Sequence, residues 1–228
     1  MTAPANRSDS RAAKDQAAKA AIMQRLRTAL AVNPIEAVEV PRNYISSGEH
    51  EAGSGPVIEV FADALRDYKA NVVQVKPEGV GEAIAQALGD LQRIVVPAGL
   101  PQEWVEALEG REVITDTAEK PLSNHELDQV DAVVTASRCA VSHTGTIMLD
   151  GAADQGRRAI TLVPDTHVVV VRAEDVYPTV PQAVAVLGQN PTRPTTWIAG
   201  PSATSDIELI RVDGVHGPRN LHVVIVES

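Results

Sequence analysis

Short aliphatic runs alternate with helix-like segments along most of this chain, and that alternation constrains the possible folds more than any other feature. The runs are rich in valine and isoleucine and have the length of strands, and between them apolar residues recur with helical spacing. Strands joined through helices pair in parallel by right-handed crossovers. The pattern therefore predicts an α/β fold with a partly parallel sheet flanked by helices. The expected strands are residues 71–75, 93–96, 112–115, 130–135, 159–163, 167–171 and 195–199, and the expected helices are residues 57–69, 78–88, 102–108 and 173–187.

The composition supports a sheet that is covered on both faces. Hydrophobic residues make up 44% of the chain but aromatic residues only 3%, so the core must consist of Val, Ile, Leu and Ala. Parallel strands that helices cover on both faces have this composition. Residues 221–226 are expected either as one more buried strand or as the second arm of a hairpin that begins near residues 207–212.

The N-terminal part of the chain differs from the rest. Residues 10–31 are rich in alanine and place apolar residues on one helical stripe, and the Pro- and Gly-rich residues 32–56 follow as a connection. The expected division is a basic N-terminal helix with its tether at residues 1–55 and a single α/β domain at residues 56–228. A mitochondrial targeting peptide is also basic and amphipathic, but Asp9 and Asp15 argue against one.

Charge is unevenly distributed between these two parts. Residues 1–30 contain six Lys or Arg and two Asp, so they carry +4 and leave −14 for the remainder of a chain whose total is −10. A basic arm of this kind can dock on its own domain or on a neighbouring subunit. The acidic remainder argues against nonspecific binding of nucleic acid, because the phosphate backbone repels it.

Other classes of protein are also disfavoured. No apolar run approaches the roughly 20 residues of a membrane helix, and no hydrophobic signal core begins the chain. Cys139 is the only cysteine, so no disulfide, zinc or iron-sulfur ligand set can come from this chain's thiols. We therefore expect a cytoplasmic protein. Neither a dinucleotide fingerprint nor a Walker loop is present.

Two turns rich in glycine and hydroxyl groups are the candidate binding elements. Thr144-Gly145-Thr146 and Gly200-Pro201-Ser202 each adjoin an expected strand. Gly200 and Pro201 allow the following amides to converge as an anion-binding nest. If both turns lie on the same edge of the sheet they frame one pocket, and otherwise they are ordinary tight turns. The candidate ligand-binding residues are Thr144, Gly145, Thr146, Gly200, Ser202, Thr204, His216 and Arg219.

Three residues are candidates for catalysis. Asp206 and Glu208 are a possible acid-base pair, or one of them caps a helix, and His216 lies on a loop that glycines constrain on both sides. His167 starts an apolar strand and is expected to be a satisfied core or rim histidine. A metal triad of His167, His216 and His222 has no recognised spacing, so no metal site is expected.

Four segments together resemble the LUD domain family. They are residues 144–149, 163–167, 200–208 and 214–219, and the resemblance extends from the basic N-terminal helix to the last strand. It implies a fold similar to that of the phosphosugar isomerase and CoA-transferase group. One departure is His143, which stands where many relatives have an acidic residue.

The resemblance also implies a function. Family members of this kind belong to a three-subunit system that oxidises L-lactate to pyruvate, in which the iron-sulfur cysteines are carried by LutA and LutB. This chain is then expected to be a subunit without a redox cofactor, which binds a small carboxylate through Arg219 or organises iron-sulfur partners. The alternative is a stand-alone enzyme of the isomerase or CoA-transferase type, with Asp206 or Glu208 as the general base.

Overall fold

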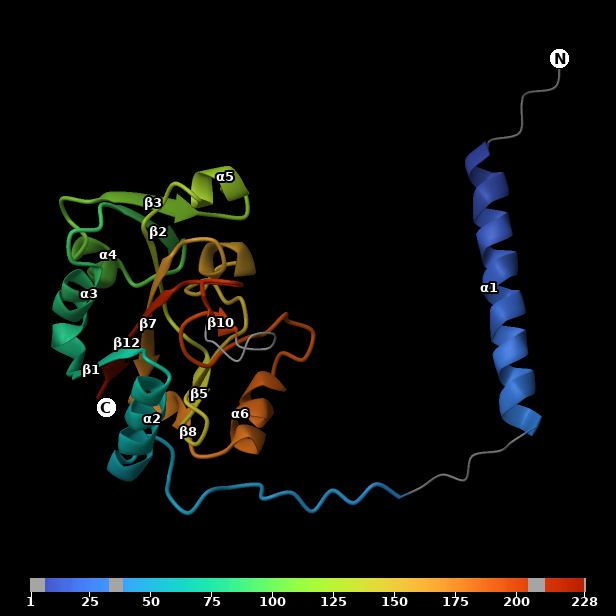
Figure 1. Ribbon diagram of the computed structural model, residues 1–228, viewed down its shortest axis with the longest axis horizontal. Helices are drawn as coiled ribbons and strands as arrows, with labels where there is room; N and C mark the ends of the chain where they lie inside the picture. Colours follow the sequence, from blue (N-terminus) through green and yellow to red (C-terminus); the bar gives the residue numbers. More distant parts are fainter. Residues whose placement is uncertain (1–6, 33–38, 205–211, 228) are drawn as a thin grey trace. The chain divides into compact units, whose positions relative to one another are not determined.

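The computed structural model describes residues 7–32, 39–204 and 212–227, in two compact units, Met1–Asn43 and Tyr44–Ser228 (Figure 1). The first unit contains helix α1 (Arg7–Val32), which agrees with the helix predicted over residues 10–31. Ile22, Leu26 and Leu30 follow one another at intervals of four residues and so lie along one side of α1. The second unit holds all the other elements.

A six-stranded sheet forms the centre of the second unit, and all its strands are parallel. Two adjacent inner strands, β12 and β7, are almost completely buried, as the valine-rich composition predicts. The last strand of the chain therefore lies inside the sheet and is not a hairpin arm. In spatial order the strands are β1 (Asn71–Val75), β12 (Asn220–Val226), β7 (Thr166–Arg172), β4 (Ala132–Thr135), β2 (Arg93–Pro97) and β3 (Glu112–Asp116).

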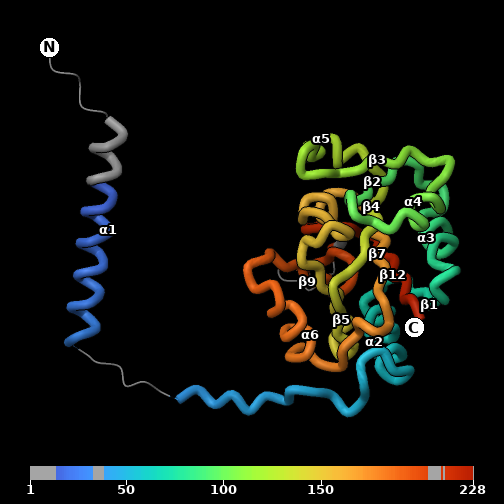
Figure 2. Tube along the Cα trace, turned by 180° about the vertical axis from the view of Figure 1, so that it is seen from behind, coloured from blue at the N-terminus to red at the C-terminus, as the bar shows by residue number. Residues whose placement is uncertain are grey.

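Helices cover one face of this sheet, and a mixed layer covers the other (Figures 1 and 2). Helices α3 (Val80–Leu88) and α4 (Gln102–Glu106) bury Ile84 and Trp104 against the first face. On the second face, α2 (Gly55–Asp67) buries Phe61 and Leu65 among residues of β7 and β12. The α/β architecture with a largely parallel sheet is thus confirmed.

A second sheet completes the mixed layer. Its order is β8-β5-β6-β9, and only the β5 and β8 pair is parallel. Helix α6 (Val180–Leu187) covers its outer side, where Cys139, Met148 and Leu187 share one apolar cluster. The strands are β5 (Cys139–Val141), β6 (Thr146–Leu149), β8 (Val176–Tyr177) and β9 (Thr196–Ile198), and a two-stranded ribbon pairs β10 (Ala203–Thr204) with β11 (Val212–Asp213).

Two predicted elements differ from the structure. Residues 159–163, expected as a strand, are mostly the 3₁₀ helix η2 (Arg158–Thr161). There the Thr161 hydroxyl donates to the Arg158 carbonyl at 3.2 Å, a local bond that competes with strand pairing. The helix expected over residues 173–187 begins only at Val180, because Pro178 disfavours a helical conformation at Tyr177 before it. The remaining short helices are η1 (Pro77–Gly79), α5 (Asn124–Leu127) and η3 (Ala173–Asp175).

Candidate functional site

The loop of residues 150–156 lies at the carboxyl edge of the six-stranded sheet, where open α/β sheets bind ligands. The Ala153 carbonyl accepts the Gly99 amide at 2.9 Å, just after β2, and the Asp154 carbonyl accepts the Ala136 amide at 3.0 Å, just after β4. Gly156 has a φ of +69°, and a Cβ there would lie 2.6 Å from Ile160 Cδ1. The loop is therefore tied to two strand ends, and glycine is required at its turn.

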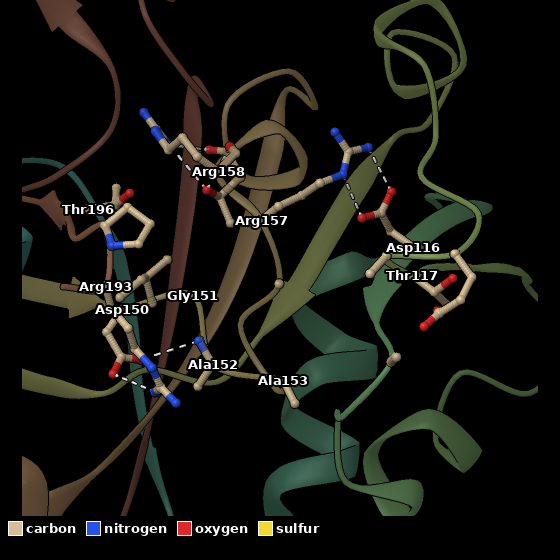
Figure 3. A pocket seen from close by; sticks show the side chains of 17 residues that line it. Asp116, Thr117, Asp150, Gly151, Ala152, Ala153, Arg157, Arg158, Arg193 and Thr196 are labelled. Atoms are coloured by element: carbon tan, nitrogen blue, oxygen red, sulfur yellow. Dashed lines mark hydrogen bonds and ion pairs between the residues drawn. The ribbon is translucent and has the colours of Figure 1, made fainter. Parts of the chain in front are cut away.

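A cavity of about 600 Å³, which we call the large cavity, opens beside this loop (Figure 3). Asp116 and Thr117, which end β3 and follow it, lie on one side, and Arg193 and Thr196 lie on the other. The other lining residues are Ala98, Ala118, Glu119, Leu149, Asp150, Gly151, Ala152, Ala153, Gly156, Arg157, Arg158, Thr161 and Pro194.

Two of the three arginines of the large cavity are held by buried carboxylates. Arg157 Nε and Nη2 donate to the two Asp116 oxygens at 2.8 and 2.7 Å, and only 3% of the Asp116 side chain is exposed. Arg193 Nη1 lies 3.0 Å from Oδ2 of Asp150, whose side chain is also 3% exposed. Arg157 and Arg193 therefore each have a buried carboxylate as partner, and Asp150 also has Arg138 Nε at 4.0 Å.

Arg158 is different. Its Nη1 donates to the Thr161 carbonyl and hydroxyl at 3.0 and 3.1 Å, and no carboxylate in the described ranges lies within 4.0 Å of its guanidinium. Desolvation by the surrounding wall lowers the pKa of Arg158 from its usual value. Arg158 thus brings a positive charge without an acidic partner among the described residues.

Arg158 and Thr161 also line a second, smaller cavity of about 250 Å³, which we call the small cavity. Three of the predicted ligand-binding residues, Gly200, Ser202 and His216, meet there. The other lining residues are His167, Trp197, Ile198, Ala199, Pro201, Ala203, Gly217, Pro218 and Leu221. Some residues of the small-cavity wall were therefore predicted from the sequence, but Arg158 was not.

Ser202 organises the loops around the small cavity. Its amide donates to the Pro218 carbonyl at 2.9 Å, and its hydroxyl oxygen accepts the His216 amide at 2.9 Å. The Ser202 amide is thus engaged by the protein and does not point to an anion, in contrast to the predicted nest. Gly200 has a φ of +88°, and a Cβ there would lie 2.7 Å from Tyr68 Cβ, so this turn requires glycine.

His167 lies fully buried at the small cavity wall, with 1% exposure. Its Nε2 is 2.8 Å from the Thr135 hydroxyl. Burial, together with the nearby Arg158 charge, lowers the pKa of His167 to about 3. The ring is therefore neutral and hydrogen-bonded, as expected for a satisfied core histidine.

The Thr144-Gly145-Thr146 turn lies apart from both cavities within the described part of the chain. It closes the β5 and β6 hairpin, and the two threonine hydroxyls lie 2.8 Å apart. Gly145 has a φ of +56°, and a Cβ there would be 3.1 Å from Ala64, so the turn packs against α2. It is a tight turn required for packing, and His143 beside it is exposed.

The remaining predicted site residues also lie elsewhere. Arg219 Nε is 2.6 Å from Asp165 Oδ1, in an exposed ion pair beside the amino end of β7. Thr204 pairs with Val212 in the β10 and β11 ribbon. Asp206 and Glu208 lie outside the described residues.

Sequence reasoning missed Asp116, Asp150, Arg158 and Arg193. The local signal for this loop was two glycines and two adjacent arginines in residues 150–158, directly after an apolar run, and it does not single out Arg158. Over residues 7–32, 39–204 and 212–227, no three His, Cys, Asp or Glu side chains are grouped as metal ligands. In the same ranges, no helix combines the length and apolar character that crossing a membrane requires.

Comparison with known proteins gives consistent matches. The model of the LUD domain family matches residues 58–226. Lactate utilization protein C of Deinococcus radiodurans is 48% identical over 172 residues, covering 75% of this chain and 79% of that protein. Lactate utilization protein C of Bacillus subtilis is 31% identical over 136 residues, which is 57% of this chain and 55% of that protein. The crystal structure of a DUF162 family protein from Deinococcus radiodurans superposes with a TM-score of 0.65 at 41% identity, covering 75% of this chain and 96% of the other.

Proposed function

Since this chain belongs to the LUD domain family, we propose that it acts in lactate utilisation as a non-redox subunit that binds a small carboxylate. The names of its relatives in Deinococcus and Bacillus support the metabolic role. The observation that carries the binding role is Arg158, a guanidinium without a described acidic partner on the wall of the small cavity.

The small cavity has the groups that a hydroxy acid such as lactate needs. A carboxylate at Arg158 forms charge-assisted hydrogen bonds, which are about twice as strong as neutral ones. The Ser202 hydroxyl accepts the His216 amide, so its own proton can be donated to a bound oxygen. The apolar side chains of Trp197 and Leu221 in the same wall suit a methyl group.

The oxidation itself is assigned to partners. Cys139, the chain's one cysteine, is buried beneath α6, and burial raises the pKa of its thiol to about 11. An iron-sulfur cluster needs several thiolates, so this chain does not fit that ligand set. We propose that iron-sulfur proteins resembling LutA and LutB supply the clusters, and that this subunit positions the carboxylate beside them.

Titration calorimetry with lactate and with pyruvate tests the binding role. Arg158→Ala is expected to weaken binding at least tenfold, because a charged hydrogen bond contributes about 1.5 to 3 kcal/mol. Arg219→Ala is expected to leave the affinity within twofold, because Asp165 already holds that guanidinium. Arg66→Ala, at an exposed pair on α2, is the matched control. Wild-type protein that binds neither acid, alone or with its partners, contradicts the proposal.

Co-purification tests the role as a subunit. Arg25→Glu combined with Arg27→Glu reverses two charges of the basic helix α1 and is expected to abolish recovery of cysteine-rich partner proteins while lactate binding persists. The control reverses Arg66 and Lys69 on the second unit, and we expect recovery to continue. If the wild type, the Arg25 and Arg27 variant and the control recover equal amounts of the partner proteins, α1 does not contact those partners.

A further inference from the structure

We propose that the large cavity is a second binding site, for an organic anion with an aromatic or similarly flat apolar body. The large cavity lies beside the small cavity of the carboxylate site proposed above, and Arg158 and Thr161 line both cavities. The large cavity has the size, the charge and the lining that suit such a ligand.

The size of the large cavity favours an occupant larger than a small acid. Cavities of roughly 300 to 1,000 Å³ enclose drug-sized ligands, and the large cavity has about 600 Å³. A three-carbon acid there would leave most of the wall in contact with water. Most of the apolar surface of the wall would then contribute nothing to affinity, so a larger molecule fits the large cavity better.

Three arginines and three acidic residues line the large cavity, and the two charged residues that lie outside its two ion pairs are Arg158 and the exposed Glu119. The Arg157–Asp116 and Arg193–Asp150 ion pairs lie at opposite sides of the large cavity (Figure 3). Within each pair, the carboxylate offsets the charge of the guanidinium. Arg158 remains as the cation without a described acidic partner at 4.0 Å or less. A single anionic group near Arg158 with an uncharged remainder therefore matches this electrostatic pattern.

The wall between these charges accepts a flat apolar body. Small residues without bulky side chains form it, so a ring can approach the backbone closely. They are contributed by the end of β2 and by the loop of residues 150–156, which hydrogen bonds hold to two strand ends. These residues are Ala98, Gly151, Ala152, Ala153 and Gly156.

The test uses 8-anilinonaphthalene-1-sulfonate, an aromatic sulfonate that becomes fluorescent in apolar sites. The full-length native protein is expected to bind one molecule per chain. Ala153→Trp and Ala118→Trp each place a bulky ring among the lining residues of the large cavity, and each is expected to weaken binding more than tenfold. Ala185→Trp is the matched control, because Ala185 is exposed on α6, and this variant should bind the dye as the wild type does.

Two further measurements define the ligand and separate the two sites. N-phenyl-1-naphthylamine, the same body without the sulfonate, is expected to bind at least tenfold more weakly. Lactate affinity in Ala153→Trp and Ala118→Trp should stay within twofold of wild type. Near-UV circular dichroism verifies that each variant keeps native packing, since loosely packed states also bind the dye.

Several outcomes would overturn the inference. The first two are that the native protein does not bind the dye, or that Ala153→Trp and Ala118→Trp bind it as tightly as the wild type does. The others are that N-phenyl-1-naphthylamine binds as tightly as the sulfonate dye, or that folded Ala153→Trp and Ala118→Trp lose lactate binding together with dye binding. Absent lactate binding with intact, cavity-dependent dye binding would instead overturn the proposed carboxylate function alone.

Discussion

Arg157→Ala is expected to lower the free energy of unfolding by about 3 kcal/mol, as measured by urea denaturation. The variant leaves the Asp116 carboxylate, 3% exposed, without the guanidinium that donates to both of its oxygens. Breaking a buried pair costs about 3 to 5 kcal/mol, and the lower end applies because 37% of the Arg157 side chain is exposed. The Leu122 amide, 2.9 Å from Asp116, remains as a partial compensation.

Arg66→Ala serves as the control for this loss. The Arg66–Asp63 pair has a similar length, 3.1 Å, but its side chains are 51% and 80% exposed. Exposed pairs contribute between 0 and about 1 kcal/mol. The double variant Asp116→Leu with Arg157→Met should recover part of the stability, since no buried charge is then left alone. Equal losses in the two arginine variants would contradict the argument.

Acidification from pH 7 to pH 5 is expected to destabilise the protein by about 2 kcal/mol through His167. The pKa of His167 is about 3 in the folded protein, against about 6.5 for an exposed histidine. Between these values the unfolded chain binds a proton that the folded chain does not. The free energy of unfolding therefore falls by about 1.4 kcal/mol for each pH unit below 6.5, until the pH nears 3.

The slope of stability against pH separates His167 from other groups. His167→Gln keeps a hydrogen-bonding side chain near Thr135 and should lose most of this slope, whatever its stability at pH 7. Burial also lowers the pKa of His222, which adds a smaller slope of the same sign. His143→Gln, at an exposed position, is the control. An unchanged slope in His167→Gln would show that its ring is protonated in the folded state.

Local sequence patterns predicted most of the architecture. The valine-rich runs at residues 71–75, 93–96 and 112–115 are strands within one residue of their predicted ends. The run at residues 159–163 has a similar composition but mostly forms η2, in which the Thr161 hydroxyl donates to the Arg158 carbonyl and Ile160 packs in a cluster with Leu127. Composition alone cannot separate these outcomes, since a short apolar run fits any buried element.

The sequence predicted only part of the candidate site, because the role of a charged side chain depends on the residue with which it pairs in space. Arg219 had the motif expected of an anchor, but Asp165, 54 residues away, holds it. Arg158 had no distinguishing motif, since two adjacent arginines usually belong to a solvated surface. Its significance comes from its neighbour Arg157, which takes Asp116 and leaves Arg158 facing the cavities.

The sequence by itself determined most of the segments that become helices and strands, that the sheet is largely parallel, and the membership of the LUD domain family. These properties follow from periodicity and from motifs within a few residues of one another. Only the tertiary structure decided the strand order, which places β12 between β1 and β7, and with it the two cavities and the pairing of their arginines. The physical reason is that ion pairs and cavities depend on distance in space. Arg157 and Asp116 are 41 positions apart in the sequence and come within 2.7 Å of each other only after the chain between them has folded.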